Sequence, residues 1–194
     1  MVGAVLTQNT AWVNAERAVA RLRCAAALDP AVIDAMPATE LATRIRPAGC
    51  FNVKATRLKA LVRWLLEQGG LDGIDRQATT DLRQSLVGVH GIGPETADAI
   101  LLYALKRPVF VVDTYTFRIF ARAGIIPTRL RDYEAVRGLV EATFPGQTGL
   151  FNEFHALLVA HGKHCCRPSP RCDDCCLAAH CAHSTGRNCL PGAT

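Results

Sequence analysis

The stretch that decides the fold reads Val89-His90-Gly91-Ile92-Gly93-Pro94-Glu95-Thr96-Ala97. Two glycines, Gly91 and Gly93, flank one aliphatic residue, and glycine allows backbone conformations that are closed to other residues. Ile92 is expected to hold the turn against the core, and Pro94 suits the first position of a helix. The stretch therefore predicts a tight turn that joins two packed helices.

A turn of this kind is a helix-hairpin-helix, whose exposed amide hydrogens lie at the positive end of the following helix. Such amides hold a DNA phosphate without reading the base sequence. An ordinary glycine-rich turn between two helices is the alternative, and a Gly-x-Gly pattern alone favours it. The other motifs of the chain have to decide between the two interpretations.

Apolar residues recur at helical spacing along most of the chain. The clearest stripe contains Leu58, Leu61, Val62, Leu65 and Leu66. Asn52 is the expected N-cap of its helix, which ends at Gly69-Gly70. Similar stripes predict helices over residues 10–28, 79–87, 94–105, 114–123, 132–144 and 150–164. We therefore predict an all-α protein of two helical lobes, residues 1–108 and 109–194, the first carrying the hairpin.

The strand-like run 109–112 is short and has no neighbour to pair with, so we expect a buried connector that crosses between the lobes. Hydrophobic residues make up 49% of the chain and charged residues 20%, which excludes an extended disordered protein and a collagen-like one. The net charge of +5 permits a nucleic-acid partner without demanding one.

The apolar start, residues 1–6, is too short to span a bilayer and lacks the basic lead and cleavage site of a secretory signal. A cytoplasmic protein with no membrane partner is therefore expected. Because this start opens an apolar helix without a polar lead or cap, we also expect that an N-terminal segment is missing.

Asp113 follows the apolar run and precedes Thr114. An N-cap is the plain interpretation, since Asp accepts amide hydrogen bonds there and its charge suits the helix dipole. A carboxylate fixed at that end also stays ionised at neutral pH, where it could stabilise a cationic sugar or activate water. The two roles are compatible, and Asp113 is the candidate catalytic residue.

Seven of the nine cysteines crowd the last part of the chain, in contrast to Cys24 and Cys50. They are Cys165, Cys166, Cys172, Cys175, Cys176, Cys181 and Cys189. A two-residue gap separates Cys172 from Cys175, a five-residue gap leads to Cys181, and either Cys165 or Cys166 can supply a fourth thiolate.

Four soft ligands on one loop suit an iron-sulfur cluster or zinc. A redox Cys-x-x-Cys pair would leave the flanking cysteines unexplained. Zinc remains a competitor, because histidines lie nearby, although we interpret these as helix-end and surface residues. They are His161, His164, His180 and His183.

The hairpin, the Val112-Asp113-Thr114 helix start about twenty residues later and the four-cysteine loop, in that order, resemble the endonuclease III family of DNA glycosylases. The resemblance covers nearly the whole chain. It implies a six-helix barrel that carries the hairpin, a second lobe with a [4Fe-4S] cluster, and a damaged base flipped out of double-stranded DNA. It also implies that Gln8 plugs the gap left by the flipped base and that Cys50 wedges the opposite strand. Without the resemblance, Gln8 is interpreted as a helix-surface amide and Cys50 as a small core residue.

Two departures from the family pattern bear on the chemistry. Family members with lyase activity carry a nucleophilic lysine two residues after the second hairpin glycine, where this chain has Glu95, and a carboxylate cannot form a Schiff base. The lysines elsewhere, among them Lys54, Lys106 and Lys163, are interpreted as solvated or phosphate-facing charges.

The second departure concerns the first cluster cysteine. The family's usual six-residue gap points to Cys165, whereas the register of His161-Gly162-Lys163 points to Cys166. We favour Cys166, together with Cys172, Cys175 and Cys181.

The hairpin with Glu in place of lysine looks like the branch similar to bacterial 3-methyladenine glycosylases. We therefore expect a monomeric, monofunctional glycosylase that acts on a damaged, alkylated base, with Asp113 stabilising the sugar cation. In it Gly91, Ile92 and Gly93 bind the DNA backbone. The alternatives are a bifunctional glycosylase with AP lyase activity on oxidised pyrimidines and a non-catalytic DNA-binding module.

Overall fold

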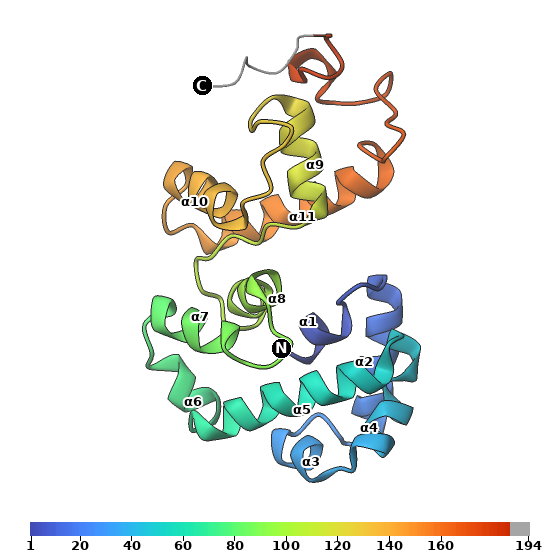
Figure 1. Cartoon of the computed structure of the whole chain (residues 1–194), viewed down its shortest axis with the longest axis vertical. Helices are drawn as coiled ribbons and strands as arrows, with labels where there is room; N and C mark the ends of the chain where they lie inside the picture. The colour runs from blue at the N-terminus through green and yellow to red at the C-terminus, as the bar shows by residue number, and fades with distance from the viewer. Residues whose placement is uncertain (187–194) are drawn as a thin grey trace. The chain divides into compact units, whose positions relative to one another are not determined.

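The computed structural model describes residues 1–186, and Cys189 lies outside them. The chain divides into two compact units, Met1–Arg107 and Pro108–Thr194 (Figure 1). Every regular element of the described residues is helical, which confirms the predicted all-α class. None of the helices among these residues is long and apolar enough to cross a membrane.

The first unit is built around one long helix. Its helices are α1 (Val2–Leu6), α2 (Trp12–Cys24), α3 (Pro30–Ala35), α4 (Ala38–Arg44), α5 (Phe51–Glu67), α6 (Gly70–Asp75), α7 (Thr79–Val87) and α8 (Pro94–Ala99), with the short 3-10 turn η1 (Arg46–Ala48) before α5 and a wider π-helical turn η2 (Ile100–Ala104) after α8. Helix α5 contacts α1, α3, α4 and α6, and Figure 1 shows it running along the unit beneath α1 and α8. Its stripe residues Leu58, Leu61, Val62 and Leu65 are at most 6% exposed, as their spacing predicts. Leu66, which the spacing also places on this face, is instead 42% exposed.

Two details of this unit differ from the expectations. The helix predicted over residues 10–28 ends at Cys24, and Ala26 takes a left-handed backbone conformation with φ 49°. Helix α5 begins at Phe51 and has Cys50, rather than Asn52, at its N-cap. The stripe of apolar residues locates the body of a helix, whereas the position where it begins depends on the chain packed before it.

The second unit contains α9 (Thr114–Ala123), α10 (Tyr133–Thr143), α11 (Thr148–His164) and the 3-10 turn η3 (Ala178–His180). Aromatic rings form its core: the centroid of the Phe110 ring lies 5.7 Å from that of Phe151 and 5.6 Å from that of Phe154. Phe154 in turn lies 6.1 Å from Phe120 on α9. The rings therefore join the connector, α9 and α11.

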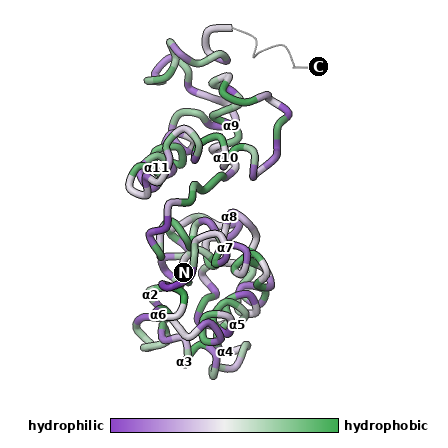
Figure 2. The backbone as a smooth tube through the Cα atoms, turned by 90° about the vertical axis from the view of Figure 1, so that its left-hand side faces the viewer, coloured by the Kyte–Doolittle hydropathy of each residue, from purple (hydrophilic) through white to green (hydrophobic). Residues whose placement is uncertain are grey.

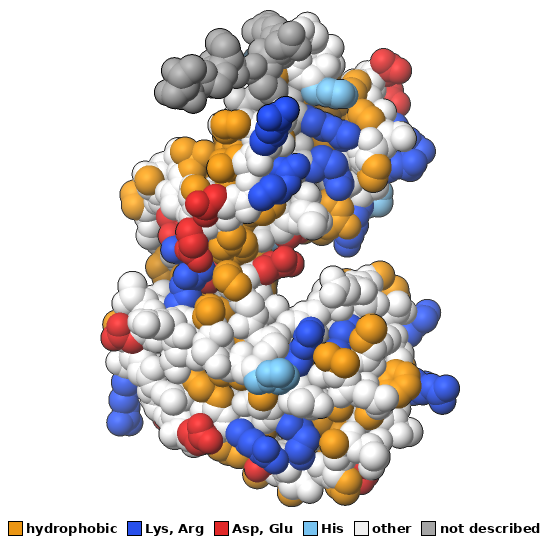
Figure 3. Space-filling model, in the orientation of Figure 1, with side chains coloured by type: hydrophobic (Ala, Val, Ile, Leu, Met, Phe, Trp, Pro, Cys, Tyr) orange, Lys and Arg blue, Asp and Glu red, His pale blue; other side chains and the backbone are white. Residues whose placement is uncertain are grey.

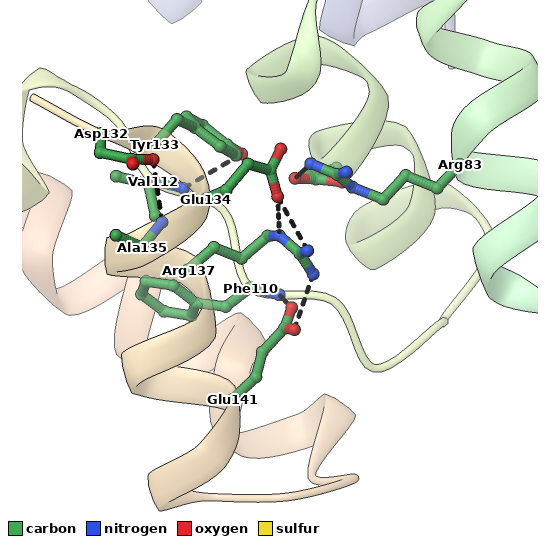
Figure 4. A network of polar contacts seen from close by, with 10 residues as sticks. Arg83, Phe110, Val112, Asp132, Tyr133, Glu134, Ala135, Arg137 and Glu141 are labelled. Atoms are coloured by element: carbon green, nitrogen blue, oxygen red, sulfur yellow. Dashed lines mark hydrogen bonds and ion pairs between the residues drawn. The ribbon is translucent and has the colours of Figure 1, made fainter.

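The run 109–112 is a buried connector, as predicted, and no strand pairs with it within residues 1–186. Its four side chains are at most 3% exposed, and Figure 2 shows its hydrophobic character in the tube ahead of α9. The amide of Phe110 donates to Glu141 Oε1 at 2.8 Å, and that of Val112 donates to the Tyr133 hydroxyl at 3.4 Å (Figure 4). Because buried amides need acceptors, side chains of α10 replace the neighbouring strand that the connector lacks.

Arg83 and Asp98 form a buried ion pair in the first unit. The guanidinium Nε lies 2.7 Å from Asp98 Oδ1, and its second nitrogen lies 3.0 Å from Oδ2. The Asp98 side chain is fully buried and that of Arg83 is 18% exposed. The pair fastens α7 to α8, the two helices that flank the hairpin.

We expect the Asp98→Ala change to lower the free energy of unfolding by about 3 kcal/mol, because it leaves a largely buried guanidinium without this carboxylate. Asp34→Ala is the matched control, since it breaks an ion pair with Arg63 whose side chains are 34% and 61% exposed. That loss should be below about 1 kcal/mol. Urea unfolding of both variants measures the difference, and equal losses would contradict the structural role of the buried pair.

Candidate functional site

The hairpin between α7 and α8 depends on Gly91. Its φ of +79° is a left-handed conformation that residues with a side chain rarely adopt. A Cβ atom at this position would lie 2.3 Å from Cγ and 2.7 Å from Nε of Arg57. Ile92 beside it is 3% exposed and anchors the turn in the core. Gly91 is thus fixed by its backbone angle and by the side chain packed against it.

Gly93 differs from the expectation. Its φ is −85°, which any residue can adopt, and a Cβ atom there would meet no atom within 4 Å. The prediction that both glycines need a special backbone conformation is therefore wrong for Gly93. Gly93 is the exposed N-cap residue of α8. Because it has no side chain, the amides in the first turn of α8 are left uncovered at this position.

Gln8 is held against the hairpin by three hydrogen bonds. Its Nε2 donates to the Gly91 carbonyl at 3.0 Å and to Thr96 Oγ1 at 2.9 Å. Its Oε1 accepts from the Arg57 guanidinium at 2.7 Å. The interpretation as a helix-surface amide is therefore wrong, because this half-buried side chain joins the turn after α1 to α5 and to the hairpin.

Two exposed residues near this part of the chain have left-handed backbones, one directly after Gln8 and the other directly before α5. Asn9 has φ 52° and Cys50 has φ 44°. Cys50 is exposed, so its interpretation as a core residue is wrong, and Gly49 before it also has a positive φ of 67°. Sequence reasoning missed Asn9, although Asn is one of the few non-glycine residues that enter the left-handed region with any frequency.

Lys54 is buried, contrary to the expectation of a solvated or phosphate-facing charge. It is 2% exposed, and its Nζ donates to the carbonyls of Leu6 and Ala48, both at 2.8 Å. Burial lowers the pKa of Lys54, and the nearby Cys50 and Arg57 act on it in opposite directions. Lys106 and Lys163 are exposed, and so is Glu95 in the first turn of α8.

Asp113 caps the N-terminus of α9 in the second unit. Its Oδ1 accepts from the amide of Thr116 at 2.8 Å and from the Thr116 hydroxyl at 3.0 Å. The amide of Asp113 donates in return to Thr116 Oγ1 at 3.4 Å, which completes a capping box. Oδ2 lies 3.6 Å from Nε2 of His155, a 9% exposed residue of α11. One carboxylate oxygen is used by the cap, and the other faces His155.

Burial alone would raise the pKa of Asp113, but the contact from His155 and the hydrogen bonds from Thr116 outweigh it and hold that pKa below its usual range. The carboxylate is therefore ionised at neutral pH, as the sequence predicts. His155 was missed by sequence reasoning. The available signal was its place in the stripe Phe151, His155, Leu158 and Gly162, where it is the single ionisable residue on the buried face of α11.

The cysteine loop follows α11 and lines a cavity of about 230 Å³. The cavity is bordered by Cys165, Cys166, Cys172, Cys175 and Cys181, together with His161 and Arg122. Burial and the neighbouring Cys175 thiol raise the pKa of Cys165 to about 11. Several thiolates cannot share this volume without a cation between them, so the donor set fits a metal ion or an iron-sulfur cluster.

The two candidates for the first ligand occupy different places. Possible ligand atoms of Cys165, Cys175 and His161 all lie within 4.8 Å of one another. The Cys166 sulfur instead accepts a hydrogen bond from Arg122 at 3.4 Å, and this guanidinium also donates to the carbonyls of Arg167 and Pro168. Of the two neighbouring cysteines, Cys165 is therefore the one whose sulfur lies close to another thiol, that of Cys175.

Basic side chains border an open hollow beside the cysteine loop. It is lined by Thr114, Tyr115, Arg118, Gly162, Lys163, Arg167 and Pro168. Figure 3 shows a group of Lys and Arg side chains on one face of the second unit. Arg118 also donates to the carbonyls of Cys166 and Gly162, so it fastens α9 to the start of the loop.

Helical units with a glycine hairpin and a four-cysteine loop define a class of DNA-repair proteins, and comparison with known families agrees. The model of the HhH-GPD superfamily of base excision DNA repair proteins matches residues 2–145. The chain therefore belongs to this superfamily of DNA glycosylases, and within it the chain is of the endonuclease III kind.

Individual relatives support the assignment. The chain is 41% identical over 186 residues to the putative DNA repair glycosylase MJ1434 of Methanocaldococcus jannaschii, covering 93% of this chain and 83% of that protein. It is 28% identical to endonuclease III of Thermotoga maritima, covering 93% and 80%.

Two solved structures share the fold. The 3-methyladenine DNA glycosylase MagIII of H. pylori, bound to 1,N6-ethenoadenine, has a TM-score of 0.73 at 30% identity over 84% of this chain and 82% of that chain. A non-covalent endonuclease III–DNA complex has a TM-score of 0.79 at 23% identity over 96% and 83%.

We expect Gly91→Ala to lower the free energy of unfolding by about 1 to 3 kcal/mol, because the added methyl group meets Arg57 and the positive φ is strained. Gly93→Ala is the matched control two residues away, with a common φ and open space. Its effect should stay within about 0.5 kcal/mol. Chemical unfolding of both variants tests this, and equal losses at the two glycines would contradict the hairpin geometry.

Proposed function

We propose that the protein is a monofunctional DNA glycosylase, which uses water to release a damaged base. The observation that carries this is Glu95, which stands at the hairpin position where lyase members of the family have their lysine. A carboxylate cannot form the imine that β-elimination requires. The buried Lys54 does not replace this lysine, because its ammonium group donates to two backbone carbonyls.

Asp113 is the proposed catalytic residue. Its lowered pKa keeps the carboxylate charged at neutral pH, and the capping box fixes it at the start of α9. A fixed negative charge stabilises the oxocarbenium-like sugar that forms as the glycosidic bond breaks, or it orients water at C1′. His155, which faces Oδ2, is the proposed group that keeps the carboxylate in place.

Double-stranded DNA is the proposed partner, held at the hairpin through Gly91, Ile92 and Gly93 by contacts to a phosphate. Cys50 is proposed to wedge the strand opposite the damage. For the turn after α1, we assign Gln8 to holding the hairpin and the adjacent Asn9 to filling the gap. The reason is that the amide of Gln8 already makes three hydrogen bonds, whereas Asn9 is exposed.

An alkylated purine is the proposed substrate class. Alkylation makes the base cationic and a good leaving group, so that a site with one carboxylate and no further acid suffices. The likeness to MagIII, which is a 3-methyladenine DNA glycosylase, supports the same class.

A [4Fe-4S] cluster is proposed for the cysteine loop, held by Cys165 with Cys172, Cys175 and Cys181. The proximity of Cys165 to Cys175 favours it over Cys166 as the first ligand. The cluster would brace the loop that carries Lys163 and Arg167 at the basic hollow. Its proposed role is therefore structural, in support of phosphate binding.

We expect duplexes that carry alkylated bases to lose the base and to be cut only after treatment with hot alkali. Asp113→Asn should slow base release by roughly two to three orders of magnitude, because one fixed charge at the sugar is lost. Asp132→Asn is the matched control, since Asp132 caps α10 through a 3.0 Å hydrogen bond from Ala135. This control should release the base at the wild-type rate.

Borohydride separates the alternatives. A trapped covalent protein–DNA adduct would establish attack by an amine and favour the lyase. Failure to release any base from a panel of alkylated and oxidised duplexes would favour the non-catalytic DNA-binding module. Both assays, borohydride trapping and base release, are carried out with the whole chain under single-turnover conditions.

We expect the purified protein to be brown and to contain iron, and Cys165→Ser to lose most of that iron. Cys166→Ser is the matched control at the adjacent position and should keep it. Metal analysis together with the visible absorption spectrum measures both variants. Zinc without iron in the wild-type protein would contradict the cluster, and loss of iron from Cys166→Ser alone would reverse the choice of ligand.

A further inference from the structure

The charged side chain of Lys54 lies in the protein interior, where burying a charge is energetically unfavourable. Its side chain is 2% exposed, and it is the sole lysine among the buried residues of the described chain. Removing an ammonium group from water is unfavourable unless its donors are satisfied. Two backbone carbonyls, those of Leu6 and Ala48, accept from it at 2.8 Å each.

The two carbonyls have the same structural origin. Leu6 is the last residue of α1, and Ala48 is the last residue of the 3-10 turn η1. Carbonyls at the end of a helix lack intrahelical partners and carry partial negative charge. A single ammonium group at the start of α5 therefore caps two helix ends that are 42 positions apart in the sequence, at residues 6 and 48.

An exposed residue with a left-handed backbone follows each capped end within three residues. Asn9 stands three residues after Leu6, with φ 52°, and Cys50 stands two residues after Ala48, with φ 44°. Residues other than glycine adopt this conformation at a cost, and they keep it where the surrounding structure fixes the chain. Lys54 is the side chain common to the starts of both segments.

We propose that Lys54 is a positioning residue that holds Asn9 and Cys50 at a fixed spacing, so that the two tips enter an opened duplex together. The proposal rests on the proposed function, in which these two residues contact the two strands at the site of damage. The new element is that the spacing between Asn9 and Cys50 is set by the buried ammonium group of Lys54, which itself does not contact DNA.

Helix α5 also carries a matched control. Lys59 donates to the carbonyls of Ile33, Asp34 and Met36 at 3.2, 2.7 and 2.6 Å, and so caps the end of α3. The chain after α3 takes an ordinary φ of −66° at Met36. Lys59→Met therefore removes a lysine cap from the same helix without releasing either tip.

The experiment compares Lys54→Met, Lys59→Met and the wild-type chain. The first readout is the ratio of affinities for a duplex with one tetrahydrofuran abasic-site analogue and for the same duplex undamaged. The second is the fluorescence of 2-aminopurine placed opposite the analogue, which rises when that base is unstacked. Thermal unfolding reports the stability of each variant.

We expect Lys54→Met to lower the affinity ratio roughly tenfold and to reduce the fluorescence rise, with binding to undamaged DNA within about twofold of wild type, because phosphate contacts through the hairpin remain. Lys59→Met should lose stability and keep both DNA readouts. Lys54→Gln, whose shorter amide can reach at most one of the carbonyls, should fall between wild type and Lys54→Met. It carries the test if Lys54→Met does not fold.

The outcomes separate the two hypotheses. Wild-type affinity ratio and fluorescence in Lys54→Met, or in Lys54→Gln where that variant carries the test, would overturn the positioning role. Equal losses of both readouts in Lys54→Met and Lys59→Met would also overturn it, because they would mark a general loss of stability. A wild-type chain that does not distinguish the abasic duplex from the undamaged one would instead overturn the proposed function of the tips.

Discussion

Two side chains in the first turns of α5 donate hydrogen bonds to segments that precede it in the first unit. Lys54 donates to the ends of α1 and η1, and one turn later Arg57 donates to Gln8 and packs against Gly91. The short elements α1 and η1 have too few internal hydrogen bonds to be stable alone. Their ends, and with them the turns that follow, are placed by these two side chains of the longest helix in the unit.

In the second unit, two carboxylate side chains satisfy backbone amides. Asp113 satisfies the amide at the start of α9, while Glu141 satisfies the amide of the buried connector at Phe110. Capping alone explains why a carboxylate stands at Asp113. The contact from His155 adds what capping does not require, namely a second oxygen that is oriented and a carboxylate that stays charged in a partly buried place.

Local sequence patterns predicted the motifs of the site, but they did not predict which residues pack around those motifs. The hairpin, the cap at Asp113 and the cysteine loop are each defined within a few residues, so their spacing alone indicated them. Gly93 shows the limit of this reasoning: both hairpin glycines look alike in the sequence, but Arg57 packs against Gly91 only. Lys54 shows it again, because a lysine ahead of an apolar stripe gives no sign that two distant carbonyls surround it.

The sequence by itself determined the helical class, the turn at Gly91-Ile92-Gly93, the capping role of Asp113 and the set of thiol donors on the cysteine loop, which is consistent with a metal ion or cluster. These depend on periodicity, backbone angles and ligand chemistry, which are properties of neighbouring residues. The tertiary structure alone decided that Gln8 is held by the hairpin while Asn9 is exposed, that His155 faces Asp113, and that Cys165 rather than Cys166 faces Cys175. Each of these depends on which of two adjacent side chains, or which distant helix, packing turns toward the site, and the period of a helix does not contain that information.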